Sequence, residues 1–360
     1  MSDVVVIGGG VMGMLTSREL AKSGLKVKLI EKGELGGESS WAGGGILSPL
    51  YPWRYPDAVN KMACWSRDHY QTLAQQLKQE SGIDPEWQQS GLLMLDADQI
   101  ESAAHWAEDY KQPTELLDSG EISETEPSLG AVSERALLLP DIAHIRNPRL
   151  LKSLRISLEK LGVEIVEHTE VTNLVAQSGR ITALELGSET LPASQIVVTC
   201  GAWSARLLAS VGVQVDVQPV RGQMLLFKAV PGLVKHIIHE QGRYVIPRLD
   251  GHILVGSTLE HVDFDKGTTS EALVSLLETA YHLVPSLHEY QVVKHWAGLR
   301  PGTKDGIPYV GAHPDLAGVF VNTGHFRNGL VLAPSSARLL VEIMLEKQAH
   351  IDASMYSLVR

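Results

Sequence analysis

The hydrophobic positions of the chain begin with a β-branched run, Val4 to Ile7, which is typical of a strand buried on both faces. The run enters the glycine-rich sequence GGGVMG, residues 8–13, and a helical pattern that includes Leu15 and Leu20 follows it. A second apolar run, Lys26 to Ile30, predicts the next strand. This order of strand, glycine turn, helix and strand is that of a βαβ unit in a parallel sheet.

The middle and the end of the chain carry further periodic segments. Helices are predicted over 57–78, 147–161 and from Leu330 to Met344, and short strands over 91–95, 163–166, 171–175, 181–186, 196–199 and 319–322. From Val217 to Trp296 the pattern changes to longer alternating strands, with a hairpin of 244–246 and 253–255 across Asp250 and Gly251. The chain is therefore predicted to be an α/β protein with a second, antiparallel domain.

The first glycine turn has the spacing of a dinucleotide-binding site. Gly8 allows the tight turn, Gly10 lets the backbone approach a pyrophosphate, and Gly13 lets the helix pack closely on the strand. Glu31 ends the second strand, where an acid can accept hydrogen bonds from a ribose hydroxyl. These residues indicate an adenine dinucleotide, and at this point it could be NAD or FAD.

Two more glycine-rich segments bear on the choice of cofactor. Residues 36–46 offer successive N–H groups and the Ser39 and Ser40 hydroxyls to an extended cofactor, and the alternative is a surface loop. In the segment 298–329, glycine turns enclose Arg300 and Arg327 before the last helix, whose N-terminus can stabilise negative charge on a flavin. Either guanidinium could hold a substrate carboxylate, or could cap carbonyls or pair with an acid such as Asp305.

Composition excludes several classes of protein. The 360 residues include 31 basic and 42 acidic side chains, and a net charge of −11 disfavours binding to nucleic acid or anionic lipid. Two cysteines, Cys64 and Cys200, cannot form a disulfide framework, and no signal peptide or membrane helix is evident, so we expect a cytoplasmic protein. We expect no metal, because no HExxH or CxxC set is present, and no GxSxG elbow indicates a hydrolase.

Seven motifs together resemble a known family. VVIGGGVMG, EKG, SSWAGGGILSP, VVTCGAW, YVIPR, WAGLRPGTKDGIPYVG and GHFRNGLVLAP stand in the order found in the FAD-dependent amine and D-amino-acid oxidases. This family includes sarcosine oxidase and, with the closer resemblance, the bacterial glycine oxidases of the thiamine pathway. The resemblance covers the chain and implies a discontinuous Rossmann-like FAD-binding domain over 1–85, 144–217 and 296–360. An antiparallel-sheet substrate domain would comprise 86–143 and 218–295.

The resemblance also implies roles for individual residues. Arg300 would bind the substrate carboxylate, Tyr244 would donate its hydroxyl to the same group, and Arg327 would lie close to the substrate. Gly242 and Leu259 depart from the larger side chain and the methionine expected there, which affects the shape of the pocket. No cysteine lies near Arg300, so non-covalent FAD is expected. The implied cofactor-binding residues are Gly8, Gly10, Val11, Met12, Gly13, Glu31, Lys32, Ser39, Ser40, Gly44, Gly45, Ile46, Val171, His325, Phe326, Arg327, Asn328, Gly329, Leu330 and Val331.

The implied reaction is the oxidative deamination of glycine and other small amines, namely sarcosine, D-alanine and D-proline. Hydride would pass to flavin N5, and the products would be glyoxylate or another 2-oxo acid, ammonia or an amine, and hydrogen peroxide. No acid or base residue is required, because Arg300 and Tyr244 position the substrate. The resemblance further suggests a homotetramer and a role in thiazole formation for thiamine. The alternatives are a D-amino-acid dehydrogenase that reduces a quinone, an NAD-linked dehydrogenase, or a protein that only holds a dinucleotide.

Overall fold

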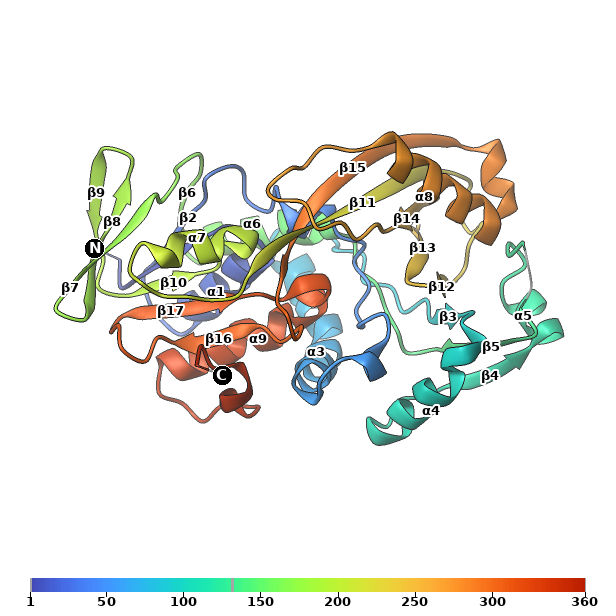
Figure 1. Cartoon of the computed structure of the whole chain (residues 1–360), viewed down its shortest axis with the longest axis horizontal. Helices are drawn as coiled ribbons and strands as arrows, with labels where there is room; N and C mark the ends of the chain where they lie inside the picture. Colours follow the sequence, from blue (N-terminus) through green and yellow to red (C-terminus); the bar gives the residue numbers. More distant parts are fainter. Residues whose placement is uncertain (1, 131–132, 360) are drawn as a thin grey trace.

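The computed structural model describes residues 2–130 and 133–359, and two sheets organise it (Figure 1). The first sheet has the strand order β16-β17-β10-β1-β2-β6. Its strands are β1 (Val4–Ile7), β2 (Val27–Ile30), β6 (Glu164–Val166), β10 (Ile196–Val198), β16 (Tyr309–Ala312) and β17 (Val319–Thr323). All neighbours pair in parallel except β16, which is antiparallel to β17. The central strand β1 is buried along its whole length, as its unbroken apolar run predicted.

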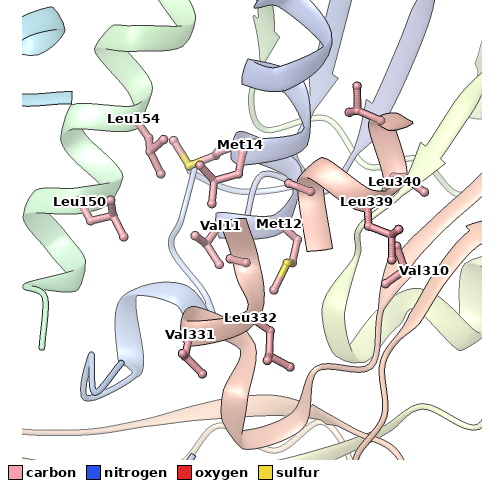
Figure 2. Packing of buried hydrophobic residues seen from close by; sticks show 14 of the residues in the cluster. Val11, Met12, Met14, Leu150, Leu154, Val310, Val331, Leu332, Leu339 and Leu340 are labelled. Atoms are coloured by element: carbon pink, nitrogen blue, oxygen red, sulfur yellow. The ribbon is translucent and has the colours of Figure 1, made fainter. Parts of the chain in front are cut away.

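Helices cover one face of this parallel sheet. α1 (Val11–Lys22) and α9 (Gly329–Met344) contact its strands, and α3 (Asp57–Ser81) and α6 (Asn147–Lys160) pack against these helices. Figure 2 shows Val11 and Met14 of α1 beside Leu154 of α6 and Val331 of α9, within one apolar cluster. Each such side chain contributes roughly 1.5–3 kcal/mol when it is fully buried. This packing fixes the N-terminus of α1 next to the N-terminus of α9.

The opposite face carries a small antiparallel sheet and a short helix. The strands β7 (Asn173–Gln177), β8 (Arg180–Leu186) and β9 (Glu189–Pro192) form the sheet, and α7 (Ser204–Ala209) is the helix. Their side chains Leu184 and Leu208 join Val5 and Val198 of the parallel sheet in a second apolar cluster. The parallel sheet is therefore covered on both faces, as expected of a Rossmann-like unit.

The second large sheet has eight strands in the order β15-β11-β14-β13-β12-β3-β5-β4. They are β3 (Leu92–Met94), β4 (Glu115–Asp118), β5 (Arg135–Leu139), β11 (Gln218–Lys228), β12 (Ile237–Glu240), β13 (Arg243–Pro247), β14 (His252–Gly256) and β15 (Gln291–Gly302). Its pairs are antiparallel, as predicted, except for the parallel pair of β3 and β12. The α/β fold with a largely antiparallel second sheet is confirmed.

Several elements differ from the sequence prediction. The stretch 217–296 was assigned to strands, but it contains the helix α8 (Ser270–Leu283), whose buried Leu276 and Ala280 pack under the sheet. The strand predicted over 171–175 begins at Asn173. The sequence pattern did not predict the helices α2 (Ser39–Ala42), α4 (Ile100–Asp109), α5 (Ser119–Thr125) and α7, or the strands β4, β5, β9 and β16. Short 3₁₀ segments lie at Pro52–Arg54, Ala97–Gln99, Gly201–Trp203, Pro285–Glu289, Phe326–Asn328 and Ala353–Tyr356.

Two long strands bring the sheets together. β11 and β15, the yellow and orange arcs at the top of Figure 1, pair along nearly their whole length. The end of β15 contacts both Gly201–Trp203 and Phe326–Asn328, which follow strands β10 and β17 of the parallel sheet. Ligands of open α/β sheets bind at the carboxyl ends of the strands, so this junction is the expected place for a site. Among the described residues, no helix is long and apolar enough to cross a membrane.

Candidate functional site

A single cavity at this junction brings together the residues that the sequence analysis selected. Of the predicted cofactor and substrate residues, the cavity is lined by Gly8, Gly10, Val11, Met12, Glu31, Lys32, Ser39, Ser40, Gly44, Gly45, Ile46, Val171, Tyr244, Arg300 and every residue from His325 to Val331. Gly13 lies behind the wall, where a Cβ would overlap the Gly8 carbonyl oxygen. Its place agrees with close packing of the helix on the glycine turn rather than with contact to a ligand.

The glycine turn is shaped by backbone contacts. Gly8 has φ +104°, and a Cβ there would stand 2.6 Å from the carbonyl oxygen of Thr199. The helix α1 starts directly after the turn, and Ser40 Oγ accepts the N–H of Val11 at 2.9 Å. Because the first N–H groups of a helix have no partner within it, this end of α1 attracts an anion such as a pyrophosphate.

Glu31 is held in place by the backbone around it. One carboxylate oxygen accepts the N–H of Gly9 at 2.6 Å and the other accepts the N–H of Gly33 at 2.8 Å. A carboxylate has about four acceptor positions, so each oxygen can also accept a ribose hydroxyl. The ammonium group of Lys32 lies 3.4 Å from the centre of the Trp203 ring, which also lines the cavity.

The loop that carries Gly44, Gly45 and Ile46 is fixed from behind rather than free at the surface. Arg248 donates one N–H to the Gly44 carbonyl at 2.7 Å and another to the Ile145 carbonyl at 3.1 Å. Burial lowers the pKa of the Arg248 guanidinium to about 9. The alternative that this segment is a surface loop is wrong for residues 39–46, because Ser39, Ser40, Gly44, Gly45 and Ile46 line the cavity.

Two unpaired polar atoms in the wall test whether an extended polar cofactor fits. Asn147 and Asn328 are 2% and 3% exposed, and among the described residues Oδ1 of Asn147 and Nδ2 of Asn328 have no hydrogen-bond partner. A buried polar group without a partner costs about 1–3 kcal/mol, so a ligand that supplies partners is stabilised there. One acceptor and one donor, together with the N-terminus of α1, suit the polar groups of a flavin dinucleotide.

Arg300, near the end of β15, is the cation of the predicted substrate site. Its guanidinium donates to the Ser257 hydroxyl at 2.8 Å and to the Thr258 carbonyl at 3.2 Å. Burial lowers the pKa of the Arg300 guanidinium, and the neighbouring Tyr244 hydroxyl acts in the opposite direction. Arg300 therefore caps a backbone carbonyl, which is one of the alternatives that the sequence left open for it. Its side chain also lines the cavity.

Tyr244 links this cation to the cofactor loop. Its hydroxyl points to Met224 Sδ at 3.8 Å, which is a weak acceptor, so the proton can be redirected to a carboxylate. A Cβ on Gly44 would stand 3.1 Å from Cε2 of Tyr244. The ring therefore packs directly against a residue predicted to contact the cofactor. The structure brings the predicted substrate and cofactor residues within contact distance.

Arg327 and Gly242 form the neighbouring part of the wall. Arg327 donates to the carbonyl oxygen of Gly242 at 3.4 Å, and Gly242 occupies the β12–β13 turn with φ +75°. The side chain of Leu259, the other departure from the family pattern, is 45% exposed. Arg327 thus lines the cavity beside Gly242, a turn residue that has no side chain.

His325 is buried and neutral. Its Nε2 lies 2.8 Å from Ser336 Oγ, and Ser336 in turn donates to Asn322 Oδ1 at 2.6 Å. Because the serine proton is used by Asn322, the imidazole nitrogen must donate to the serine oxygen. Burial lowers the pKa of His325 to about 3, so it holds no charge near neutral pH.

Sequence reasoning missed several residues of the site. Trp203 lay inside the motif VVTCGAW and could have been selected as an aromatic next to a strand end. Ser257 and Thr258, which hold Arg300, follow β14 and carry no local signal. Arg248 was part of YVIPR, but its bond to the Gly44 carbonyl depends on contact between segments about 200 residues apart. Long-range contacts of this kind cannot be obtained from local patterns.

Comparison with known proteins agrees with this geometry. The family model described as DAO, FAD dependent oxidoreductase, matches residues 3–343. A glycine oxidase of Pseudomonas aeruginosa is 47% identical over 355 residues, which is 98% of each chain. The crystal structure of glycine oxidase from Geobacillus kaustophilus covers 100% of this chain and 98% of its own, with TM-score 0.95 and 31% identity.

A further relative is the bifunctional protein ThiO/ThiG of Trichormus variabilis, 30% identical over 354 residues, or 96% of this chain and 53% of the relative. The choice between NAD and FAD, which the first glycine turn left open, is decided for FAD by the family. The chain belongs to the DAO family of FAD-dependent oxidoreductases.

Proposed function

We propose that this enzyme oxidises glycine, and other small amines such as sarcosine, D-alanine and D-proline, with oxygen as the electron acceptor. For glycine, one molecule each of substrate, oxygen and water would give glyoxylate, ammonia and hydrogen peroxide. The observation that carries the proposal is Arg300, a partly buried cation that lines the cavity together with Tyr244. Relatives called glycine oxidase support glycine as the substrate.

Arg300 and Tyr244 would bind the carboxylate of the substrate. A guanidinium can donate two parallel N–H bonds to a carboxylate, and the Tyr244 hydroxyl would add a third. Such a three-point anchor fixes the direction of the Cα–H bond. Bound FAD would supply the two-electron acceptor for that bond. The small hydrophobic and glycine residues of the loop around Gly44 would exclude water from the same region.

Positioning, without a protein acid or base, is the proposed origin of catalysis. The buried His325 donates to Ser336 and is neutral, so we assign it a structural role. The substrate would react with its amine unprotonated, and the imine formed from glycine would be hydrolysed by water to glyoxylate and ammonia. Arg327 would lie next to the substrate at the mouth of the cavity, where it adds positive charge for the carboxylate.

Anaerobic mixing with glycine is the direct test of this function. We expect the visible absorbance of the purified holoenzyme to bleach with glycine and to return when oxygen is admitted, with one peroxide formed per glyoxylate. A panel of sarcosine, D-alanine and D-proline would order the substrates. Bleaching without peroxide on re-oxygenation would instead support a dehydrogenase that reduces a quinone. No bleaching with any of these amines would contradict the proposed substrate class.

We also propose that FAD is held without a covalent bond. Cys200 lines the cavity, but its thiol donates to the Ile7 carbonyl at 3.3 Å and burial raises its pKa to about 12. A thiol with such a pKa is a poor nucleophile. Acid precipitation should therefore release all the yellow colour into the supernatant, and colour retained in the pellet would contradict this proposal.

The biological setting is proposed from the relatives and from family resemblance. The match to a bifunctional ThiO/ThiG protein supports a role in thiazole formation for thiamine. A cytoplasmic homotetramer is the assembly implied by the resemblance, and light scattering of the holoenzyme tests it. The two sheets support the predicted FAD-binding domain over 1–85, 144–217 and 296–360, and a substrate domain over 86–143 and 218–295.

A further inference from the structure

The tight turn between β12 and β13 is held by side chains from three distant segments. Gln241 and Gly242 form the turn with φ +48° and +75°. Asp96 Oδ1 accepts the N–H of Gln241 at 2.8 Å, and the Tyr51 oxygen accepts the N–H of Gly242 at 2.7 Å. Arg327 donates to the Gly242 carbonyl at 3.4 Å. The turn therefore connects Arg327 with two residues outside the cavity described above.

Tyr51 and Asp96 form one unit behind this turn. The Tyr51 hydroxyl donates to Asp96 Oδ2 at 3.2 Å, and the two residues are 7% and 9% exposed. The Tyr51 ring packs against the buried ring of His239 with 4.5 Å between centroids. Replacing either polar group would remove the acceptor of one N–H of the turn, and each of these hydrogen bonds is partly buried.

The unit also borders a second hollow, next to Arg327. Tyr51, Asp96, Gln241 and Gly242 line this hollow, and Arg327 lines it as well as the main cavity. Arg327 is thus in the wall between the two spaces. Its hydrogen bond to the Gly242 carbonyl ties the Arg327 guanidinium to the β12–β13 turn.

We propose that Tyr51 and Asp96 are positioning residues of the substrate site, which act through the β12–β13 turn to hold Arg327 beside the substrate carboxylate. The proposal rests on the proposed function in so far as the ligand of Arg327 is a carboxylate. Neither residue lies in the wall of the main cavity, so neither acts by direct contact with the cofactor. The chemical class of ligand that they influence is a small carboxylate.

The variant Tyr51→Phe tests the role of the hydroxyl while keeping the ring on His239. In the holoenzyme, we expect the KM for glycine and the Kd for acetate, followed by the visible spectrum of FAD, to rise about fivefold to tenfold. We expect kcat to change less than twofold, and FAD affinity to stay the same, because Arg300 and the cofactor loop are untouched. Asp96→Asn keeps one acceptor oxygen. It should raise the KM for glycine and the Kd for acetate by a smaller factor, again with little change in kcat and FAD affinity.

Tyr110→Phe is the matched control. Tyr110 also makes a tyrosine–carboxylate hydrogen bond, in which its hydroxyl donates to Asp57, but this bond does not involve the turn. This control should leave KM and the acetate Kd unchanged. The proposal is wrong if Tyr51→Phe behaves like the control, and also if it lowers FAD affinity, kcat and thermal stability together. If the wild type fails to oxidise glycine, the proposed function fails, whereas the acetate comparison still decides the role of Tyr51.

Discussion

The guanidinium of Arg300 lies directly over the backbone of Gly222, in the place where any other residue would have its Cβ. The register of β11 and β15 explains this, because Arg300 pairs with Val220, and Gly222 is the next residue on the same face. A Cβ at Gly222 would stand much closer to Nη1, Nη2 and Cζ of Arg300 than van der Waals contact allows. Because Gly222 has no side chain, the Arg300 guanidinium, the predicted substrate anchor, can lie against the backbone of β11.

Gly222→Ala should weaken substrate binding without loss of FAD. The methyl group must push the guanidinium away from Ser257 and the substrate carboxylate, and a charge-assisted hydrogen bond contributes about 1.5–3 kcal/mol, so we expect KM to rise at least tenfold. Steady-state kinetics and the acetate Kd measure the effect. Gly120→Ala, in the helix α5 and away from the cavity, is the control. Equal KM values in the two variants would contradict this account.

Arg300→Lys should keep the positive charge but lose the paired N–H groups. A lysine presents a point charge and cannot form the same bidentate contact, so we expect kcat/KM for glycine to fall about a hundredfold. Arg300→Ala should show a larger loss in the rate of anaerobic reduction, with FAD still bound. Stopped-flow absorbance measures that rate. Arg180→Lys, at an exposed position of β8, should reduce at the rate of the wild type, and a similar rate in Arg300→Ala would disprove the role of Arg300.

Local sequence was sufficient to predict the glycine turn of the cofactor site. The turn at Gly8 to Gly13 could be predicted because its geometry depends on backbone conformations within a few residues and on the strand and helix that flank it. Arg300 and Arg327 could be selected because proline and glycine restrict their surroundings. Resemblance to a family then gave them roles that residue type alone left open.

The supports of the site could not be predicted in the same way. Ser257 is held near Arg300 only by the order of strands β15, β11 and β14 in the sheet. Tyr51 and Asp96 meet the β12–β13 turn across about 145 to 190 residues of sequence. The helix α8 was missed because its apolar positions Ala272, Leu276 and Ala280 stand within a region read as alternating strands. Pairing between distant segments, and not local preference, decides these contacts.

Arg248→Met should loosen the cofactor loop. The substitution removes the donors for the carbonyl oxygens of Gly44 and Ile145 and would leave both without those bonds, so we expect the Kd for FAD to rise at least tenfold. Fluorescence titration of the apoprotein with FAD measures this constant. Arg146→Met is the control, because Arg146 pairs with Glu86 and Asp250 but does not contact Gly44. An unchanged Kd in Arg248→Met would show that the loop is held by other contacts.

Acid should destabilise the protein through His239. Burial, and then the charges of Arg327 and Arg54, lower the pKa of His239 to about 3 from 6.5. Between these values the unfolded chain binds a proton that the native chain does not, so the free energy of unfolding falls as the pH drops below 6.5. At pH 5 the loss from this one group is about 2 kcal/mol relative to neutral pH.

His239→Gln removes this titration and should flatten the dependence of stability on pH. Urea unfolding of the variant and the wild type at pH 7.5 and pH 5 gives the comparison, and the other titrating groups cancel because both proteins contain them. We expect the decrease between the two pH values to be about 2 kcal/mol smaller in the variant. His69→Gln, at an exposed position, should leave the decrease unchanged. If both variants lose as much stability as the wild type, His239 is already protonated in the native protein at pH 5, with Asp96 Oδ2, 3.8 Å from its Nδ1, as the opposite charge.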